Sequence, residues 1–165
     1  MDSSDSLAPR ELSVAAGSAL RTRGWRVAAA ESCTGGLVLK LLTDVPGSSA
    51  YVAGGVVAYS DQVKVEVLGV DPELIREFGA VSGEVAGAMA RGVRNRLGVE
   101  VGVAVTGIAG PGGAVPGKPV GTVWFAVAGP GEVRVEEVRF AGSREEVRAR
   151  AADHALSILV RAARG

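Results

Sequence analysis

The apolar run Val99–Val105 constrains the fold of this chain more than any other segment. Short runs of this kind are typical of strands in a parallel sheet that is covered on both faces. Two similar strands are predicted earlier, over Arg26–Ala30 and Tyr51–Tyr59, the second flexed by Gly54 and Gly55. Helical patterns separate the three runs, and strands that alternate with helices indicate a parallel α/β arrangement.

A hairpin then changes the pattern. Two further strands, Val120–Ala128 and Val133–Phe140, are joined by a four-residue turn with two glycines and a proline. The two strands of a hairpin are antiparallel, which argues against an all-parallel sheet. The expected fold is therefore α/β: a three-layer α/β/α sandwich with a mixed, mostly parallel sheet of about five strands. The predicted helices are Glu11–Arg23, Gly35–Thr43, Asp61–Leu68, one beginning at Asp71–Glu73, Ser82–Leu97, and one from a capping box at Ser143 to about Arg161.

Composition sets the class of protein. The chain has 165 residues, enough for one domain with a real core, which we expect over residues 7–163, with residues 1–6 flexible. Lys plus Arg and Asp plus Glu are both 18, and this zero net charge argues against a large nucleic-acid surface. No apolar run is long enough to span a membrane, and the acidic, Ser-rich start is unlike a signal peptide. One cysteine excludes an internal disulfide, so a cytoplasmic protein is expected.

The segment Glu31–Gly36 places two hydroxyls, a thiol and a carboxylate where the first predicted strand ends and a helix begins. The first backbone N–H groups of a helix have no internal partner and favour negative charge, including a developing oxyanion. A nucleophile here would have part of its catalytic environment supplied by the backbone. Taken alone, the segment is also a typical helix cap, and that interpretation is favoured from these six residues.

Two other segments follow strands and are expected to meet the first one, because ligands of open α/β sheets bind at the carboxyl ends of the strands. Tyr59–Lys64 follows the second strand and Thr106–Gly113, a Gly-rich loop, follows the third. Lys64 is the best candidate for a base, since a helix N-terminus and burial both disfavour an ammonium group. The alternative for Lys64 is an exposed helix lysine, and the alternative for Thr106–Gly113 is an ordinary surface loop.

Other candidates carry less weight. Cys33 is a possible nucleophile, but no histidine adjoins it in sequence. His154 lies within the last helix and is expected to be a packing or surface histidine. The arginines of Arg91–Arg96 and Arg139–Arg161 alternate with apolar or acidic residues, which is typical of solvated helix faces.

Six motifs in order closely resemble the CinA C-terminal domain family, the nicotinamide mononucleotide amidohydrolases also called PncC, in its stand-alone form. The resemblance runs from about Leu7 to the last helix. The motifs are AESCTGG at 30–36, PGSS at 46–49, VAYSDQVK at 57–64, GAVS at 79–82, TGIAGP at 106–111 and KPVGTVWF at 118–125.

The resemblance implies hydrolysis of the nicotinamide mononucleotide carboxamide to the acid and ammonia, in pyridine nucleotide recycling, with no metal and no cofactor. It implies that Ser32 is the nucleophile and Lys64 its general base, and we expect Tyr59 to hydrogen-bond one of them. The family also suggests a homo-oligomer with a small-molecule nucleotide substrate. The residues expected to bind substrate are Glu31, Cys33, Thr34, Gly35, Gly36, Ser48, Ser49, Thr106, Gly107 and Gly110.

One alternative is carried alongside the amidohydrolase. The same crevice would serve a non-catalytic nucleotide-binding module, or a regulatory module associated with competence or DNA damage, as the family name suggests. Direct binding of DNA has little support from the zero net charge.

Overall fold

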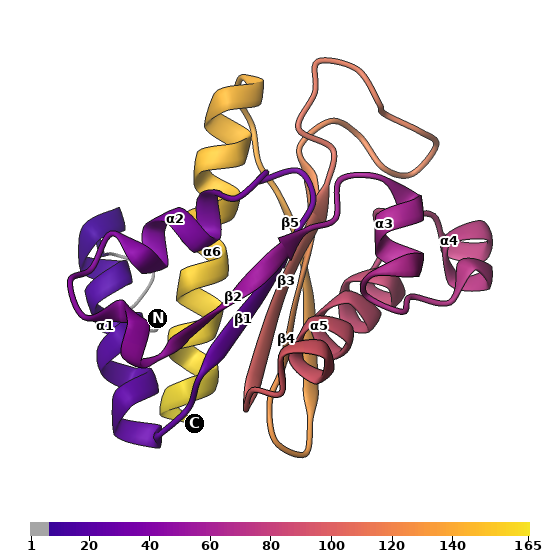
Figure 1. Ribbon diagram of the computed structural model, residues 1–165. Coiled ribbons are helices and arrows are strands. Elements are labelled where there is room, and N and C mark those ends of the chain that lie inside the picture. The colour runs from indigo at the N-terminus through magenta and orange to yellow at the C-terminus, as the bar shows by residue number, and fades with distance from the viewer. Residues whose placement is uncertain (1–6) are drawn as a thin grey trace.

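Five strands form one mixed sheet in a computed structural model that describes residues 7–165 (Figure 1). The segment expected to be flexible, residues 1–6, lies outside the described residues. The α/β fold with its terminal hairpin is confirmed: the first three strands are parallel, and the last two are antiparallel to their neighbours. Across the sheet the order is β2 (Val52–Val57), β1 (Val27–Glu31), β3 (Val101–Gly107), β4 (Thr122–Ala128) and β5 (Val133–Arg139).

Helices cover both faces of the sheet (Figure 1). One group consists of α1 (Pro9–Arg23), α2 (Leu37–Thr43) and α6 (Arg144–Arg164). The other group consists of α3 (Asp61–Glu66), α4 (Pro72–Phe78) and α5 (Gly83–Leu97). A 3-10 turn, Ser48–Ala50, leads into β2. Among residues 7–165, none of the helices has the length and apolar character that crossing a membrane would need.

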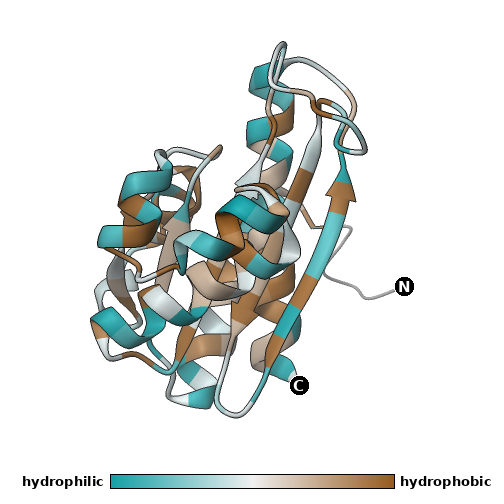
Figure 2. Cartoon of the chain, turned by 90° about the vertical axis from the view of Figure 1, so that its right-hand side faces the viewer, coloured by the Kyte–Doolittle hydropathy of each residue, from teal (hydrophilic) through white to brown (hydrophobic). Residues whose placement is uncertain are grey.

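Strand β1 shows why the layers form. All five of its residues are buried, and neighbouring side chains enter different cores because side chains alternate across a strand. Val27 and Ala29 pack with α1 and α6, whereas Ala28 and Ala30 pack with α5. Figure 2 shows the same pattern, with hydrophobic residues along the strands and hydrophilic ones on the outer sides of the helices.

Several element boundaries differ from the sequence prediction for local reasons. The first helix begins at Pro9, since proline fits the first helical position. The second begins at Leu37 rather than Gly35, because Gly35 and Gly36 have φ values of +58° and +109°, outside the helical region. The last helix continues to Arg164 because Ala163 is buried.

The predicted caps are confirmed. Ser60, Asp71 and Ser143 each accept a hydrogen bond from a backbone N–H in the first turn of α3, α4 and α6. Such a cap is worth about 1 kcal/mol of helix stability. The cap at Ser60 matters most for the site, since it fixes where α3 begins and therefore where Lys64 points.

The register of the parallel strands brings three loops together. Glu31 pairs with Val57 on one side and Val105 on the other. The segments that follow β1, β2 and β3 therefore leave the sheet at the same edge. The start of α6 lies at this end of the molecule as well (Figure 1).

A prediction concerns the close approach of α5 to the sheet at Gly102 in β3. A Cβ atom at this position would lie 2.2 Å from the carbonyl oxygen of Ala90 in α5. Gly102→Ala should therefore lower the free energy of unfolding by about 1–3 kcal/mol, because the helix must move outward. Urea denaturation measures the change. Gly112→Ala is the matched control, since a Cβ there meets open space; equal stability losses in the two variants would contradict the prediction.

Candidate active site

Ser32 is the first residue after β1 and begins a tight turn into α2. Its backbone N–H still donates to Val105 O at 2.9 Å, which ties the residue to the end of β3. The next turn closes at once, with Gly35 N–H donating to Ser32 O at 3.1 Å. The Ser32 backbone is therefore held on both sides, and the residue is 8% exposed.

Lys64 reaches Ser32 from the first turn of α3. Side chains of a helix lean toward its N-terminus, so the Lys64 stem points back toward the end of β2. Its Nζ donates to Ala58 O at 2.9 Å and to Ser32 Oγ at 3.2 Å. The residue is 1% exposed. The interpretation of Lys64 as an exposed helix lysine is therefore wrong, and the structure brings the two residues together.

The surroundings of Lys64 favour the neutral amine. Burial lowers the pKa of Lys64, because a desolvated ammonium group is unfavourable. The Asp61 carboxylate, 4.0 Å from Nζ, opposes this effect, but it is 63% exposed and therefore well solvated. Glu66 instead accepts a hydrogen bond from Gln62 on the helix surface. A neutral amine beside a hydroxyl is suited to take the proton of that hydroxyl.

The side chain of Glu31 occupies backbone N–H groups at the start of α2, which were expected to favour a developing oxyanion. Its fully buried carboxylate accepts hydrogen bonds from the backbone N–H groups of Gly36, Val38 and Leu39 at 3.2, 2.9 and 3.1 Å. Glu31 therefore caps α2 through its side chain, and the Gly36 donor points at Glu31. Within residues 7–165, the N–H groups of Cys33 and Thr34 make no hydrogen bond to another residue, which leaves these two donors for a ligand.

The side chains of Cys33 and Thr34 are both buried. Burial raises the pKa of the Cys33 thiol to about 11, so the thiolate is scarce at neutral pH. This agrees with an inert Cys33. Thr34 Oγ1 is buried, with no hydrogen-bond partner among the described residues.

Tyr59 lies on the rim of the site with 63% exposure. The expected partner of its hydroxyl was Lys64 or Ser32. In the structure the Tyr59 hydroxyl instead accepts from Arg144 Nη2 at 3.3 Å. Lys64 donates instead to the backbone carbonyl of Ala58, the residue before Tyr59.

The loop that follows β3 forms another wall. Thr106 Oγ1 donates to Ala80 O at 2.9 Å, so this buried hydroxyl joins β3 to the segment before α5. Gly107 lies against the Ser32 turn, since a Cβ there would be 3.1 Å from Cys33 Sγ. Gly110 offers its carbonyl oxygen to Arg144 Nη1 at 2.9 Å.

Ser48 and Ser49 do not join the site. They form the 3-10 turn that precedes Val52, at the amino end of β2, whereas Ser32 follows the carboxyl end of β1. The strands between these ends span roughly 16 Å at 3.3 Å per residue. The expectation that Ser48 and Ser49 bind substrate beside Ser32 is therefore corrected.

Two arginines of α6 belong to the site, although the sequence analysis placed them on a solvated face. Arg148 Nε donates to Cys33 O at 2.9 Å, and Arg144 bonds Gly110 and Tyr59. Their spacing of four residues puts both on one side of the helix, which is the only signal in the sequence. That spacing does not say which loops the helix faces, so the contact is visible only in the fold.

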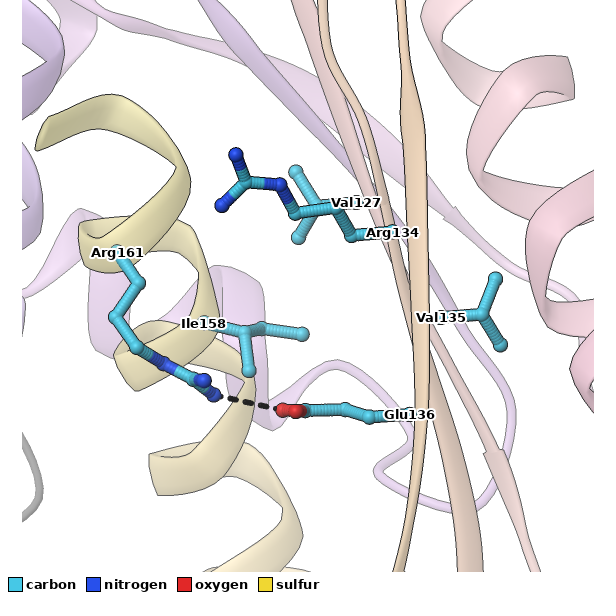
Figure 3. Close-up of a pocket in the computed structure, with 6 residues that line it drawn as sticks. All are labelled: Val127, Arg134, Val135, Glu136, Ile158 and Arg161. Atoms are coloured by element: carbon cyan, nitrogen blue, oxygen red, sulfur yellow. Dashed lines mark hydrogen bonds and ion pairs between the residues drawn. The ribbon is translucent and has the colours of Figure 1, made fainter. Parts of the chain in front are cut away.

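A separate hollow lies between β5 and α6 (Figure 3). Glu136 and Arg161 form an ion pair of 2.7 Å across it, and Val135 points away from α6. His154 also contacts Glu136, and its ring packs 4.6 Å from that of Phe125, as expected for a packing histidine. The residues that line this hollow include no Ser, Cys, Thr or Lys nucleophile.

Comparison with known proteins finds similar sequences over almost the whole chain. The family model described as the CinA C-terminal domain matches residues 10–163. "Nicotinamide-nucleotide amidohydrolase PncC" of Enterobacter agglomerans is 49% identical over 152 residues, covering 92% of this chain and 93% of that protein. A "CinA-like protein" of Acidobacterium capsulatum is 52% identical over 142 residues, 86% of this chain. The chain spans about a third of the length of that relative and of several others.

Solved structures share the fold. The competence/damage inducible protein CihA from Agrobacterium tumefaciens superposes with a TM-score of 0.91 at 41% identity, covering 95% of this chain and 96% of that one.

The burial of Lys64 predicts a pH-dependent stability difference. Because the folded protein releases the Lys64 proton at a lower pH than the unfolded chain, the unfolded chain binds more protons between the two pKa values. The free energy of unfolding of the wild type then rises with pH across that window. Lys64→Met lacks this rise, so its stability relative to the wild type should fall as pH increases toward the ordinary pKa of lysine.

Urea denaturation at several pH values measures this difference. Lys40→Met, which removes an exposed lysine of α2, corrects for the general loss of a lysine. A stability difference for Lys64→Met that does not change with pH would contradict the prediction.

Proposed function

The chain belongs to the CinA C-terminal domain family, and from this premise we propose that it hydrolyses the carboxamide of nicotinamide mononucleotide to nicotinic acid mononucleotide and ammonia. The observation that carries the proposal is the buried hydrogen bond between Lys64 Nζ and Ser32 Oγ. The name of the Enterobacter agglomerans relative, which matches over nearly its whole length, supports the choice of substrate.

Acylation begins with a proton transfer. Neutral Lys64 takes the Ser32 proton as Oγ attacks the carboxamide carbon, and the carbonyl oxygen becomes an oxyanion. The two backbone N–H groups without an acceptor, at Cys33 and Thr34, are suited to hold that oxyanion. Lys64 then donates its proton to the departing nitrogen, the C–N bond breaks, and ammonia leaves an ester on Ser32.

Deacylation reuses the same groups. Water attacks the ester carbon while Lys64 takes one of its protons, and the second oxyanion occupies the same donors. The C–O bond to Ser32 then breaks, Lys64 returns the proton to Oγ, and the carboxylic acid leaves. Both steps require Lys64 to begin neutral, which its burial favours.

Rigid support explains why this small turn suits the reaction. Glu31 fixes the start of α2, Val105 fixes the Ser32 backbone, and Arg148 holds the Cys33 carbonyl. A nucleophile and its base held in one geometry avoid the entropy cost of meeting.

One prediction of the proposed mechanism concerns ammonia release from nicotinamide mononucleotide. Ser32→Ala and Lys64→Ala should each lower kcat/KM by at least about 10³-fold, because each removes a partner of one proton transfer. A coupled ammonia assay measures the rates, and circular dichroism checks the fold.

Cys33→Ala is the matched control. It should retain activity, because it removes only the thiol and keeps the backbone N–H that is proposed to bind the oxyanion. An active Ser32→Ala variant together with an inactive Cys33→Ala variant would replace this mechanism with a thiol mechanism. Binding of the nucleotide by the wild type without any ammonia release would contradict the enzyme function itself.

A second prediction concerns the pH dependence of kcat/KM. The rate should rise with pH through one ionisation, the loss of the Lys64 proton, with a midpoint below the ordinary pKa of lysine. Asp61→Asn removes a charge that stabilises the ammonium form, so it should lower the midpoint.

Glu66→Gln, on the same helix but bonded to Gln62, is the control and should leave the midpoint in place. An unchanged or higher midpoint in Asp61→Asn would show that another group controls the profile.

A further inference from the structure

We propose that Arg144 is a specificity-determining residue that binds the phosphate of the substrate, so that the site selects a nucleoside monophosphate over the unphosphorylated nucleoside. The inference rests on the amidohydrolase function proposed above. Arg144 is the first residue of α6, directly after its cap Ser143. It was not among the residues expected from the sequence to bind substrate.

Arg144 bridges the two loops that enclose the Ser32–Lys64 pair. Its Nη1 donates to Gly110 O in the loop after β3, and its Nη2 donates to the Tyr59 hydroxyl in the loop after β2. Tyr59 directly follows Ala58, the residue whose carbonyl accepts from Lys64. The guanidinium therefore lies on the rim of the same crevice.

Arg148 fixes the position of Arg144 relative to the nucleophile. It lies one helical turn further along α6 and donates to the carbonyl of Cys33, the residue next to Ser32. Side chains four residues apart on a helix are neighbours, about 5–6 Å apart at Cβ. Arg144 is thus set beside the reacting residues but not on them, where the remote end of a nucleotide would lie.

The charge of Arg144 has no acidic partner. Within residues 7–165, the ion pairs of 4.0 Å or less include neither Arg144 nor Arg148. The acceptors of Arg144 are a carbonyl and a phenol, both neutral. Of the two acidic residues that follow it, Glu146 accepts from the backbone N–H of Ser143.

Phosphate chemistry matches this arrangement. A guanidinium presents two parallel donors that fit two phosphate oxygens, and a phosphate adds a Coulomb attraction between opposite charges that a carbonyl or a phenol does not supply. A phosphate that replaces the Gly110 and Tyr59 acceptors therefore gains a charge-assisted bidentate contact. A nucleoside without phosphate gains nothing from Arg144.

The test compares two ligands that the enzyme does not consume, nicotinic acid mononucleotide and nicotinic acid riboside, by calorimetry. The wild type should bind the mononucleotide more tightly. Arg144→Gln should weaken binding of the mononucleotide by about 10–100-fold and leave binding of the riboside unchanged, which removes the preference. Arg144→Lys should give an intermediate preference, since it keeps the charge without the fork.

Arg150→Gln is the matched control, because the hydrogen bond of this α6 arginine goes to Ala141 O and not to the loops after β1, β2 and β3. It should bind both ligands like the wild type. An Arg144→Gln variant that still prefers the mononucleotide would overturn the inference, as would a wild type without any preference. Failure of the proposed function is separate: the wild type would then release no ammonia from nicotinamide mononucleotide, whatever the binding measurements give.

Discussion

The end of a lysine side chain lies inside this protein, between a serine hydroxyl and a backbone carbonyl. Lys64 donates to Ser32 Oγ at 3.2 Å and to Ala58 O at 2.9 Å, and the residue is almost completely buried. Burial of an ammonium group is unfavourable without a closely paired anion. The nearby Asp61 carboxylate is exposed and lies 4.0 Å from the Lys64 Nζ, so it compensates for this burial only in part. The fold therefore holds Lys64 where its proton is lost more readily than that of an exposed lysine, and such a stability cost is common at catalytic sites.

The arrangement depends on the parallel part of the sheet. Pairing of Glu31 with Val57 and Val105 brings the ends of three strands to one edge, and the buried Glu31 carboxylate then fixes the start of α2. With those N–H groups occupied by Glu31, the backbone donors within residues 32–39 that bond no other residue are those of Cys33 and Thr34, directly after the nucleophile. The cap and the catalytic turn are thus the same structure, with Glu31 supplying the cap.

Much of the fold was predictable because it rests on local patterns. Apolar runs gave the strands, the Gly-Pro turn gave the hairpin, and the caps at Ser60 and Ser143 were correct. The pairing of Ser32 with Lys64 followed from two strand ends at one sheet edge, together with the family motifs.

The rest depended on contacts between segments far apart in sequence. Arg144 and Arg148 lie more than 80 residues from the loops after β1 and β2 that they contact, and their helix pattern is that of an ordinary solvated face. Ser48 and Ser49 lie in a motif close to Ser32 in sequence, yet strand direction puts them at the opposite end of β2. The role of Glu31 is visible only in the fold, where its buried carboxylate accepts hydrogen bonds from the first turn of α2.

The most direct test of the account is the pKa of Lys64 itself, measured by NMR titration of the lysine Cε signals. The chain has three lysines, so Lys64 can be assigned by comparison with Lys64→Met. The account predicts that the Lys64 signal titrates below the ordinary range for lysine and at the midpoint of the kcat/KM profile. A Lys64 signal that titrates in or above the ordinary range would contradict it, because the lysine would then be charged when it must accept the Ser32 proton.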